Sequence, residues 1–318
     1  MTASISPWYS HPYSTAGRRI FVIGDVHGML EPMESVLETF RELAGEGGPE
    51  GADLVWLGDV IDRGPESAAC LQAYLADDPA FENVARLCGN HEQMMLLGLG
   101  FHPHRDRSEI ATRVWQGIRY QTWLSNGGVI ASHSFRAAAC IPDLEEDALE
   151  DLIAANREAL DEISIDLPSK FYEGQGASYR VGDLLFVHAG VHPFRDLEEF
   201  LARPWWEFPT EGTDPEENFW SWIRGPFLIH PYPAGERTLV LHGHTPQRPA
   251  IELFSERDVP FPDNCADADQ VAAFVEGGGH RIYEGKLNLD GGSFDTGLVV
   301  GVQIEDGRYR IIAAWGQT

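Results

Sequence analysis

Side chains that bind metal ions through oxygen or nitrogen follow short apolar runs at several separate points of the chain. They are Asp25, His27, Asp59, Asn90, His188 and His244. The set contains no thiolate, and its carboxylate, amide and imidazole groups suit a pair of Mn, Fe or Zn ions. Two ions that share a carboxylate can hold a hydroxide between them and clamp phosphoryl oxygens. The chemistry that these residues predict is hydrolysis of a phosphate ester.

The segments that carry the first four of these residues are typical of strands followed by loops and helices. Apolar runs at 20–23, 53–57 and 84–87 each end in a polar loop, and a helical pattern follows each loop. Successive strand, loop and helix units imply parallel strands, whose carboxyl ends share one edge of a sheet. We therefore expect the polar loops to converge at that edge.

The rest of the chain predicts further strands and an inserted group of helices. Residues 99–176 show helical patterns and are interpreted as a helical cap, which either shapes the substrate cleft or only packs on the domain. Its His102 and His104 either line a cleft or, as we expect by default, belong to a solvated loop. A hairpin over 179–187 leads to His188, and a strand over 238–241 leads towards His244. The C-terminal runs, two of them joined as a hairpin at 305–307, predict a second sheet. We expect one domain over 1–318, with an irregular arm at 1–16.

The composition limits the partners. The 318 residues carry a formal net charge of -27, which argues against binding to nucleic acid or to an anionic membrane. The four cysteines lack metal-site spacing and are predicted to be free thiols. No signal peptide and no apolar run long enough to span a bilayer are found, so we expect a cytoplasmic protein. The sequence does not predict an oligomeric state.

Five motifs occur in an order that resembles one known family. They are GDVHG at 24–28, GDVIDRG at 58–64, GNHE at 89–92, HAG at 188–190 and HGHTP at 242–246. Together they resemble the calcineurin-like metallophosphatase superfamily, in particular the bacterial members of its phosphoprotein phosphatase branch. This resemblance implies an α/β fold in which two facing mixed β-sheets are flanked by helices, a four-layer sandwich.

The resemblance also implies a role for each motif residue. Asp25 and His27 would bind a first metal ion and Asp59 would bridge to a second, for which the remaining ligands would be Asn90, His188 and His244. His91 would be the general acid that protonates the leaving alkoxide, oriented by Asp62. The two ions would be divalent, with Mn expected first and Fe or Zn as alternatives.

Arginines are expected to hold the phosphate of the substrate. By motif position Arg63 would be a bidentate clamp, since its planar fork matches two phosphate oxygens. A second arginine is expected between HAG and GHTP. Arg224 is the preferred candidate because it follows an aromatic cluster, and Arg195 and Arg237 are alternatives.

Three functions are compatible with these residues. The first is a phosphatase in which a metal-bridging hydroxide attacks a phosphomonoester, with phosphoserine or phosphothreonine of proteins as substrate. The second is a symmetrical hydrolase of dinucleoside polyphosphates such as diadenosine tetraphosphate. The third is an inactive module that binds phosphorylated partners, against which the presence of Asp62, His91 and Arg63 argues.

Overall fold

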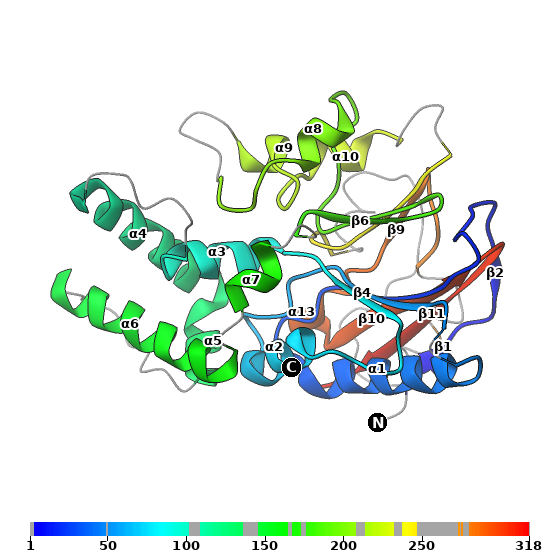
Figure 1. Ribbon diagram of the computed structural model, residues 1–318, viewed down its shortest axis with the longest axis horizontal. Coiled ribbons are helices and arrows are strands. Elements are labelled where there is room, and N and C mark those ends of the chain that lie inside the picture. Colours follow the sequence, from blue (N-terminus) through cyan, green and yellow to red (C-terminus); the bar gives the residue numbers. More distant parts are fainter. Residues whose placement is uncertain are drawn as a thin grey trace.

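Two mixed β-sheets lie face to face in the computed structural model, and helices cover their outer faces (Figure 1). The larger sheet has the strand order β1-β11-β10-β3-β4-β5, with β2 paired to β11, and the smaller has the order β6-β7-β8-β9. The predicted fold class is thus confirmed. The structure describes residues 3–48, 50–101, 109–135, 146–164, 167–172, 176–207, 214–231, 237–246, 273, 275 and 280–317.

The strands are short except for the C-terminal pair. The larger sheet contains β1 (Ser4–Ile5), β2 (Tyr9–Ser10), β3 (Arg19–Ile23), β4 (Ala52–Trp56), β5 (Asn83–Arg86), β10 (Leu298–Glu305) and β11 (Arg308–Trp315). The smaller sheet contains β6 (Ser178–Val181), β7 (Leu184–Val187), β8 (Leu239–His242) and β9 (Lys286–Asn288). Strands β3, β4 and β5 are parallel, as the strand, loop and helix units predicted, and so are β7, β8 and β9.

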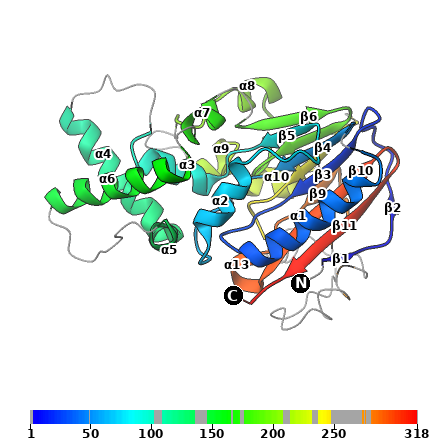
Figure 2. The same cartoon turned by 60° about the horizontal axis from the view of Figure 1, so that its bottom comes forward.

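Apart from one single turn, the described helices fall into three groups. Under the larger sheet lie α1 (Leu30–Gly45) and α2 (Ser67–Leu75), and over the smaller sheet lie α8 (Leu197–Leu201), α9 (Pro215–Asn218) and α10 (Gly225–Ile229) (Figure 1). The third group projects to one side of the sheets (Figure 2). It comprises α3 (Asn90–Gly98), α4 (Glu109–Trp123), the π-helical turn η1 (Leu124–Gly128), α5 (Val129–Ser134), α6 (Glu146–Ile163) and α7 (Leu167–Tyr172). A single turn, α13 (Ser293–Thr296), precedes β10.

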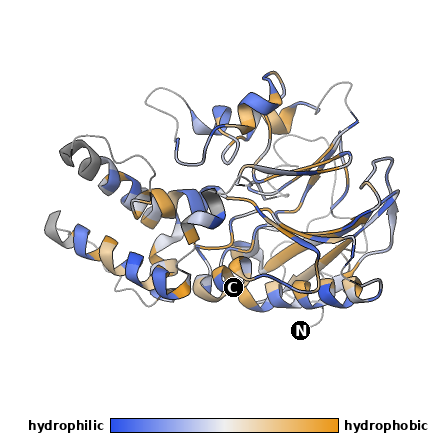
Figure 3. Ribbon diagram, viewed as in Figure 1, coloured by the Kyte–Doolittle hydropathy of each residue, from blue (hydrophilic) through white to orange (hydrophobic). Residues whose placement is uncertain are grey.

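Alternating side chains on the strands build two cores. On β3, Ile20 and Val22 belong to the core between the sheets, whereas Phe21 packs on Phe40 of α1 with ring centroids 5.3 Å apart. This alternation is the period of two that a strand imposes. Figure 3 shows the mostly hydrophobic strands of the larger sheet beside α1, which bears both hydrophobic and hydrophilic residues. Burial of both faces of β3 fixes the position of the loop that follows it.

Two expectations for the ends of the chain need correction. The hairpin of β10 and β11 does not form the second sheet but joins the larger one, where β10 pairs antiparallel with β3. Local sequence signals specify that two strands form a hairpin. The strand with which the hairpin pairs depends on which sheet edge is left open by the rest of the fold. The N-terminal arm is not wholly irregular either, because β1 and β2 each pair with β11 and extend that edge.

Most of the described residues in the segment predicted as a cap are helical, while its boundaries as a separate insertion stay a prediction. His102 and His104 lie outside the described residues. Cys70 and Cys88 are buried free thiols, and the other two cysteines are not among the described residues. Within the described part of the chain, no helix combines the length and the apolar character needed to cross a membrane.

Candidate metal centre

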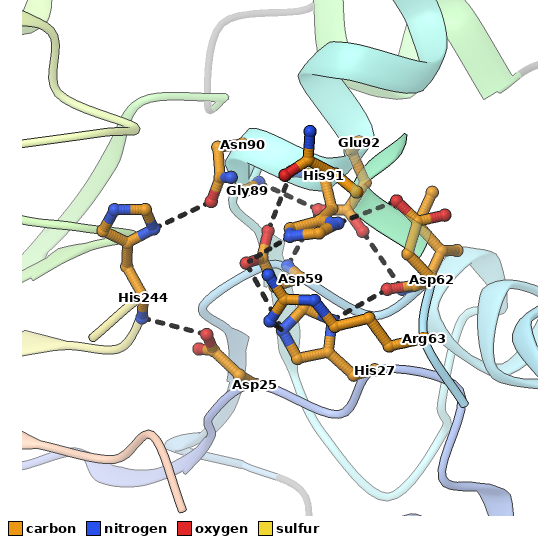
Figure 4. A network of polar contacts seen from close by, with 12 residues as sticks. Asp25, His27, Asp59, Asp62, Arg63, Gly89, Asn90, His91, Glu92 and His244 are labelled. Carbon is orange, nitrogen blue, oxygen red and sulfur yellow. Dashed lines mark hydrogen bonds and ion pairs between the residues drawn. The ribbon is translucent and has the colours of Figure 1, made fainter. Parts of the chain in front are cut away.

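Loops at the carboxyl ends of parallel strands bring the predicted ligands into one buried cluster (Figure 4). Strands β3, β4 and β5 lead into the loops of the larger sheet, and β7 and β8 into those of the smaller sheet. Because the two sheets face each other, their loops meet at one end of the molecule. Side-chain contacts, with one hydrogen bond from a backbone N–H, connect these residues in a continuous network: Asp25, His27, Asp59, Asn90, His188 and His244. That they bind metal stays a prediction.

The backbone of these loops adopts conformations that are rare for residues with side chains. Seven non-glycine residues of the described chain have a φ in the left-handed region. Five of them lie in the cluster or in the adjoining GDVIDRG loop: His27 (47°), Asp59 (50°), Asp62 (73°), Arg63 (68°) and His244 (67°). Each such conformation costs about 1–3 kcal/mol and persists only where the surroundings enforce it. The strain is therefore concentrated where the candidate chemistry lies.

One group of potential ligand atoms joins the two sheets. Atoms of Asp59, His188 and His244 all lie within 4.8 Å of one another. The Nε2 atom of His188 lies 3.4 Å from Asp59 Oδ1 and 3.1 Å from Asn90 Oδ1, which in turn lies 2.8 Å from His244 Nδ1. These are the four residues that the sequence analysis assigned to the bridging position and the second ion.

A second group lies on the other side of Asp59. It contains His27, Asp59 and His91, with His27 Nε2 located 3.7 Å from Asp59 Oδ2. Asp25 was expected here with His27, but its recorded contact is with His244, whose backbone N–H donates to Asp25 Oδ2 at 2.9 Å. Its other oxygen, Oδ1, is buried and has no hydrogen-bond partner in the described structure. An unpaired buried carboxylate oxygen is suited to a cation.

The orientation of the histidine rings shows that the cluster fits metal ions. His27, His188 and His244 each place their outer ring nitrogen on a backbone carbonyl oxygen, at 3.0, 2.9 and 3.1 Å respectively. A carbonyl only accepts, so we assign the ring proton to that nitrogen. The inner nitrogens then carry lone pairs and face oxygens of Asp59 and Asn90. The facing acceptors of His188, Asn90 and His244 are suited to a cation, whereas His27 Nε2 accepts an N–H of Arg63 in this structure. Carbonyl support of the outer ring nitrogen is typical of metal-bound histidines.

His91 and Asp62 form a short polar contact beside the cluster. His91 Nδ1 donates to Asp62 Oδ2 at 2.7 Å, and both side chains are fully buried. Burial lowers the pKa of His91 to about 4, although the charge of Asp59 opposes that shift, and burial raises the pKa of Asp62. The backbone N–H of His91 also donates to Asp59 Oδ1 at 3.0 Å. The pair is thus fixed beside the shared carboxylate.

Arg63 projects into the same space. Its guanidinium lies over the Phe294 ring, 4.3 Å from the ring centre, and its Nη1 donates to His27 Nε2 at 3.2 Å. The aromatic face supports the planar group without using its donors. Its remaining donors can therefore be shared with an anion that enters the cluster.

The proposed second arginine is close enough to influence the cluster electrostatically. Burial is the main cause of the lowered pKa of His244, and the positive charge of Arg224 is the next. The Arg224 guanidinium forms an ion pair with Glu216. Arg195 instead pairs with Asn218, and Arg237 pairs with Asp183 at 3.4 Å. Phosphate binding by Arg224 stays a prediction.

Glu92, the last residue of GNHE, holds the loop that carries Asp59. Its completely buried carboxylate accepts four backbone N–H groups. The donors are Asp59 at 2.8 Å, Gly89 at 3.0 Å, Val60 at 2.8 Å and Ile61 at 3.3 Å. Since buried N–H groups need partners, this one side chain determines the shape of the loop.

We expect Glu92→Gln to destabilise the protein by about 2–4 kcal/mol, because its amide NH₂ would face backbone N–H groups in place of an oxygen. The free energy of unfolding, measured by urea denaturation, tests this expectation. Glu38→Gln on the exposed face of α1 is the control and should be neutral. Equal stability of the two variants would contradict the role given to Glu92.

Several residues around the cluster carried no recognised signal in the sequence. Trp222 accepts the His244 ring proton through its backbone carbonyl. Phe294 supports Arg63 from the C-terminal part of the chain, and Trp123 of α4 donates to Asp62. Trp205, by contrast, is buried in the core. Only the fold shows which of these aromatic residues reach the cluster.

Comparison with known proteins identifies the family to which these motifs belong. Residues 18–281 match the profile of the calcineurin-like phosphoesterase family. Serine/threonine-protein phosphatase 1 of Salmonella typhimurium and serine/threonine-protein phosphatase 2 of Escherichia coli are each 39% identical over 79 residues, or 25% of this chain. These residues cover 32% of either relative, so the match spans about a third of its length.

A likeness to solved structures extends over more of the chain. A cold-active protein-tyrosine phosphatase of a psychrophilic Shewanella is 16% identical, with a TM-score of 0.44. That match covers 92% of this chain and 79% of the other. The family profile covers most of the chain and includes all five motif loops that build the cluster. The chain therefore belongs to the calcineurin-like phosphoesterase family.

Proposed function

We propose that the protein is a binuclear metal-dependent phosphatase that hydrolyses phosphomonoesters, with phosphoserine or phosphothreonine of proteins as the preferred substrate. The observation that carries this proposal is the position of the His91–Asp62 pair. It adjoins two groups of acceptor atoms that share Asp59. A proton donor beside a cluster suited to cations is the arrangement that metal-assisted ester hydrolysis requires.

Each residue of the site would have a separate role in the reaction. Bound metal ions would supply an activated water and positive charge for the phosphoryl oxygens. Arg63 would bind the phosphate, with its guanidinium supported by Phe294. His91 would give its Nε2 proton to the leaving alkoxide while Asp62 holds Nδ1. The charge of the bound phosphate would favour protonated His91 and so oppose the effect of burial on its pKa.

A comparison of three substrates tests the proposal. Purified protein with added Mn²⁺ is offered p-nitrophenyl phosphate, a phosphoserine peptide and diadenosine tetraphosphate at equal concentrations. We expect hydrolysis of the first two. Turnover of only the dinucleotide would refute the protein-phosphatase assignment in favour of a polyphosphate hydrolase. Binding of the phosphopeptide without turnover of any substrate would indicate an inactive recognition module.

A further inference from the structure

The helical segment formed by α4 and η1 contacts the GDVIDRG loop, which bears Asp62 of the candidate general-acid pair. The indole Nε1–H of Trp123, at the end of α4, donates to both oxygens of Asp62, at 2.9 Å to Oδ1 and 3.1 Å to Oδ2. In η1, the carbonyl of Gly127 accepts the backbone N–H of Arg63 at 3.4 Å. One helical turn therefore holds two neighbouring residues of the GDVIDRG loop.

Two consecutive glycines allow this close approach. Gly127 has a φ of 114°, and a Cβ added there would lie 2.7 Å from the backbone nitrogen of Arg63. A Cβ on Gly128 would lie 2.6 Å from the ring of Trp123. A side chain at either position would move the turn away from the loop or displace the indole. The Asn-Gly-Gly run of η1 therefore forms a contact surface for the GDVIDRG loop.

The geometry points to Trp123 as a positioning residue for the Asp62–His91 pair. A carboxylate held by one partner can rotate about its Cβ–Cγ bond, whereas a donor bridging both oxygens fixes its plane. Trp123 supplies that second donor, and in the described structure it is the hydrogen-bond partner of Oδ1. The indole is completely buried and packs against Tyr120, with ring centroids 5.7 Å apart, so the donor is itself rigid.

This inference rests on the proposed function and adds a role for the predicted cap. Trp123 lies 61 residues after Asp62, outside all five motifs. Its hydrogen bond links the helical segment to the leaving-group side of the reaction and not to metal binding. Loss of the bond should therefore affect proton donation and leave the metal content unchanged.

Leaving-group dependence tests this role. Trp123→Phe keeps an aromatic ring and removes the donor. With Mn²⁺ present, we expect kcat for phenyl phosphate, which has a poor leaving group, to fall about tenfold, a fraction of what a general acid contributes. For p-nitrophenyl phosphate, which has a good leaving group, kcat should fall less than about threefold. KM for both esters should be unchanged. Trp115→Phe is the matched control, since Trp115 lies on the same helix and is 43% exposed.

A double-mutant cycle separates this role from a general loss of structure. In an Asp62→Asn background, Trp123→Phe should cause no further change in the ratio of the two kcat values. Additive effects, an equal fall for both esters, or a change in KM alone would overturn the inference. If thermal unfolding shows that Trp123→Phe does not fold, Gly128→Ala carries the test, because its methyl displaces the indole. A wild-type protein inactive on both esters would overturn the proposed function and this inference together.

Discussion

Asp59→Asn is expected to abolish metal loading together with activity. Asp59 lies between the two groups of potential ligand atoms, with Oδ1 near His188 and Oδ2 near His27. An amide in its place offers one weaker oxygen and turns an NH₂ towards one of the groups. The charge stabilisation that metal ions supply is worth several kcal/mol, so kcat/KM should fall about a thousandfold or more.

Mass spectrometry measures the metal content of the Asp59→Asn variant, and the initial rate with p-nitrophenyl phosphate measures its activity. Two ions per wild-type chain and fewer than one in the variant are the expected contents. Asp161→Asn, at an exposed position of α6, controls for the loss of one negative charge. A variant that keeps both ions and normal activity would show that Asp59 is not the shared ligand.

The convergence of the six proposed ligand residues was predictable from the sequence because their geometry depends on local rules. A buried strand, a glycine and a polar residue place a side chain such as Asp25 at the carboxyl end of a parallel strand. Each of these features is visible within a few residues. Convergence of the loops then follows from strand direction, which the connecting helices fix. Asn90 is the one proposed ligand that does not lie in a loop, because α3 begins at this residue.

The contacts that support the cluster were not predictable in the same way. Whether Trp123 reaches Asp62 depends on how the helical segment packs, and no local pattern encodes that packing. The same holds for Phe294 beneath Arg63, which arrives from a turn after the smaller sheet. The C-terminal hairpin shows the limit at the level of the fold, since its own sequence does not specify β3 as its neighbour. Long-range packing therefore decides which residues assist the predicted ones.

His91→Ala is expected to leave metal binding intact and to slow hydrolysis by a factor that depends on the leaving group. The backbone N–H of His91, which holds Asp59 Oδ1, is retained in the variant. The imidazole, which Asp62 orients at 2.7 Å, is lost. Positioned general acids contribute about 10²- to 10⁴-fold, so kcat for phenyl phosphate should fall within that range. The fall for p-nitrophenyl phosphate should be much smaller, because p-nitrophenolate leaves without a proton.

The His91→Ala experiment also separates a catalytic role from a ligand role, since the His91 ring lies in one of the two groups of potential ligand atoms. A general acid predicts full metal content and a steep leaving-group dependence, whereas a ligand predicts loss of metal and an equal fall for both esters. His133→Ala, at an exposed position of α5, is the control. Full activity of His91→Ala towards phenyl phosphate would exclude both roles and leave the Asp62 pair with a structural function only.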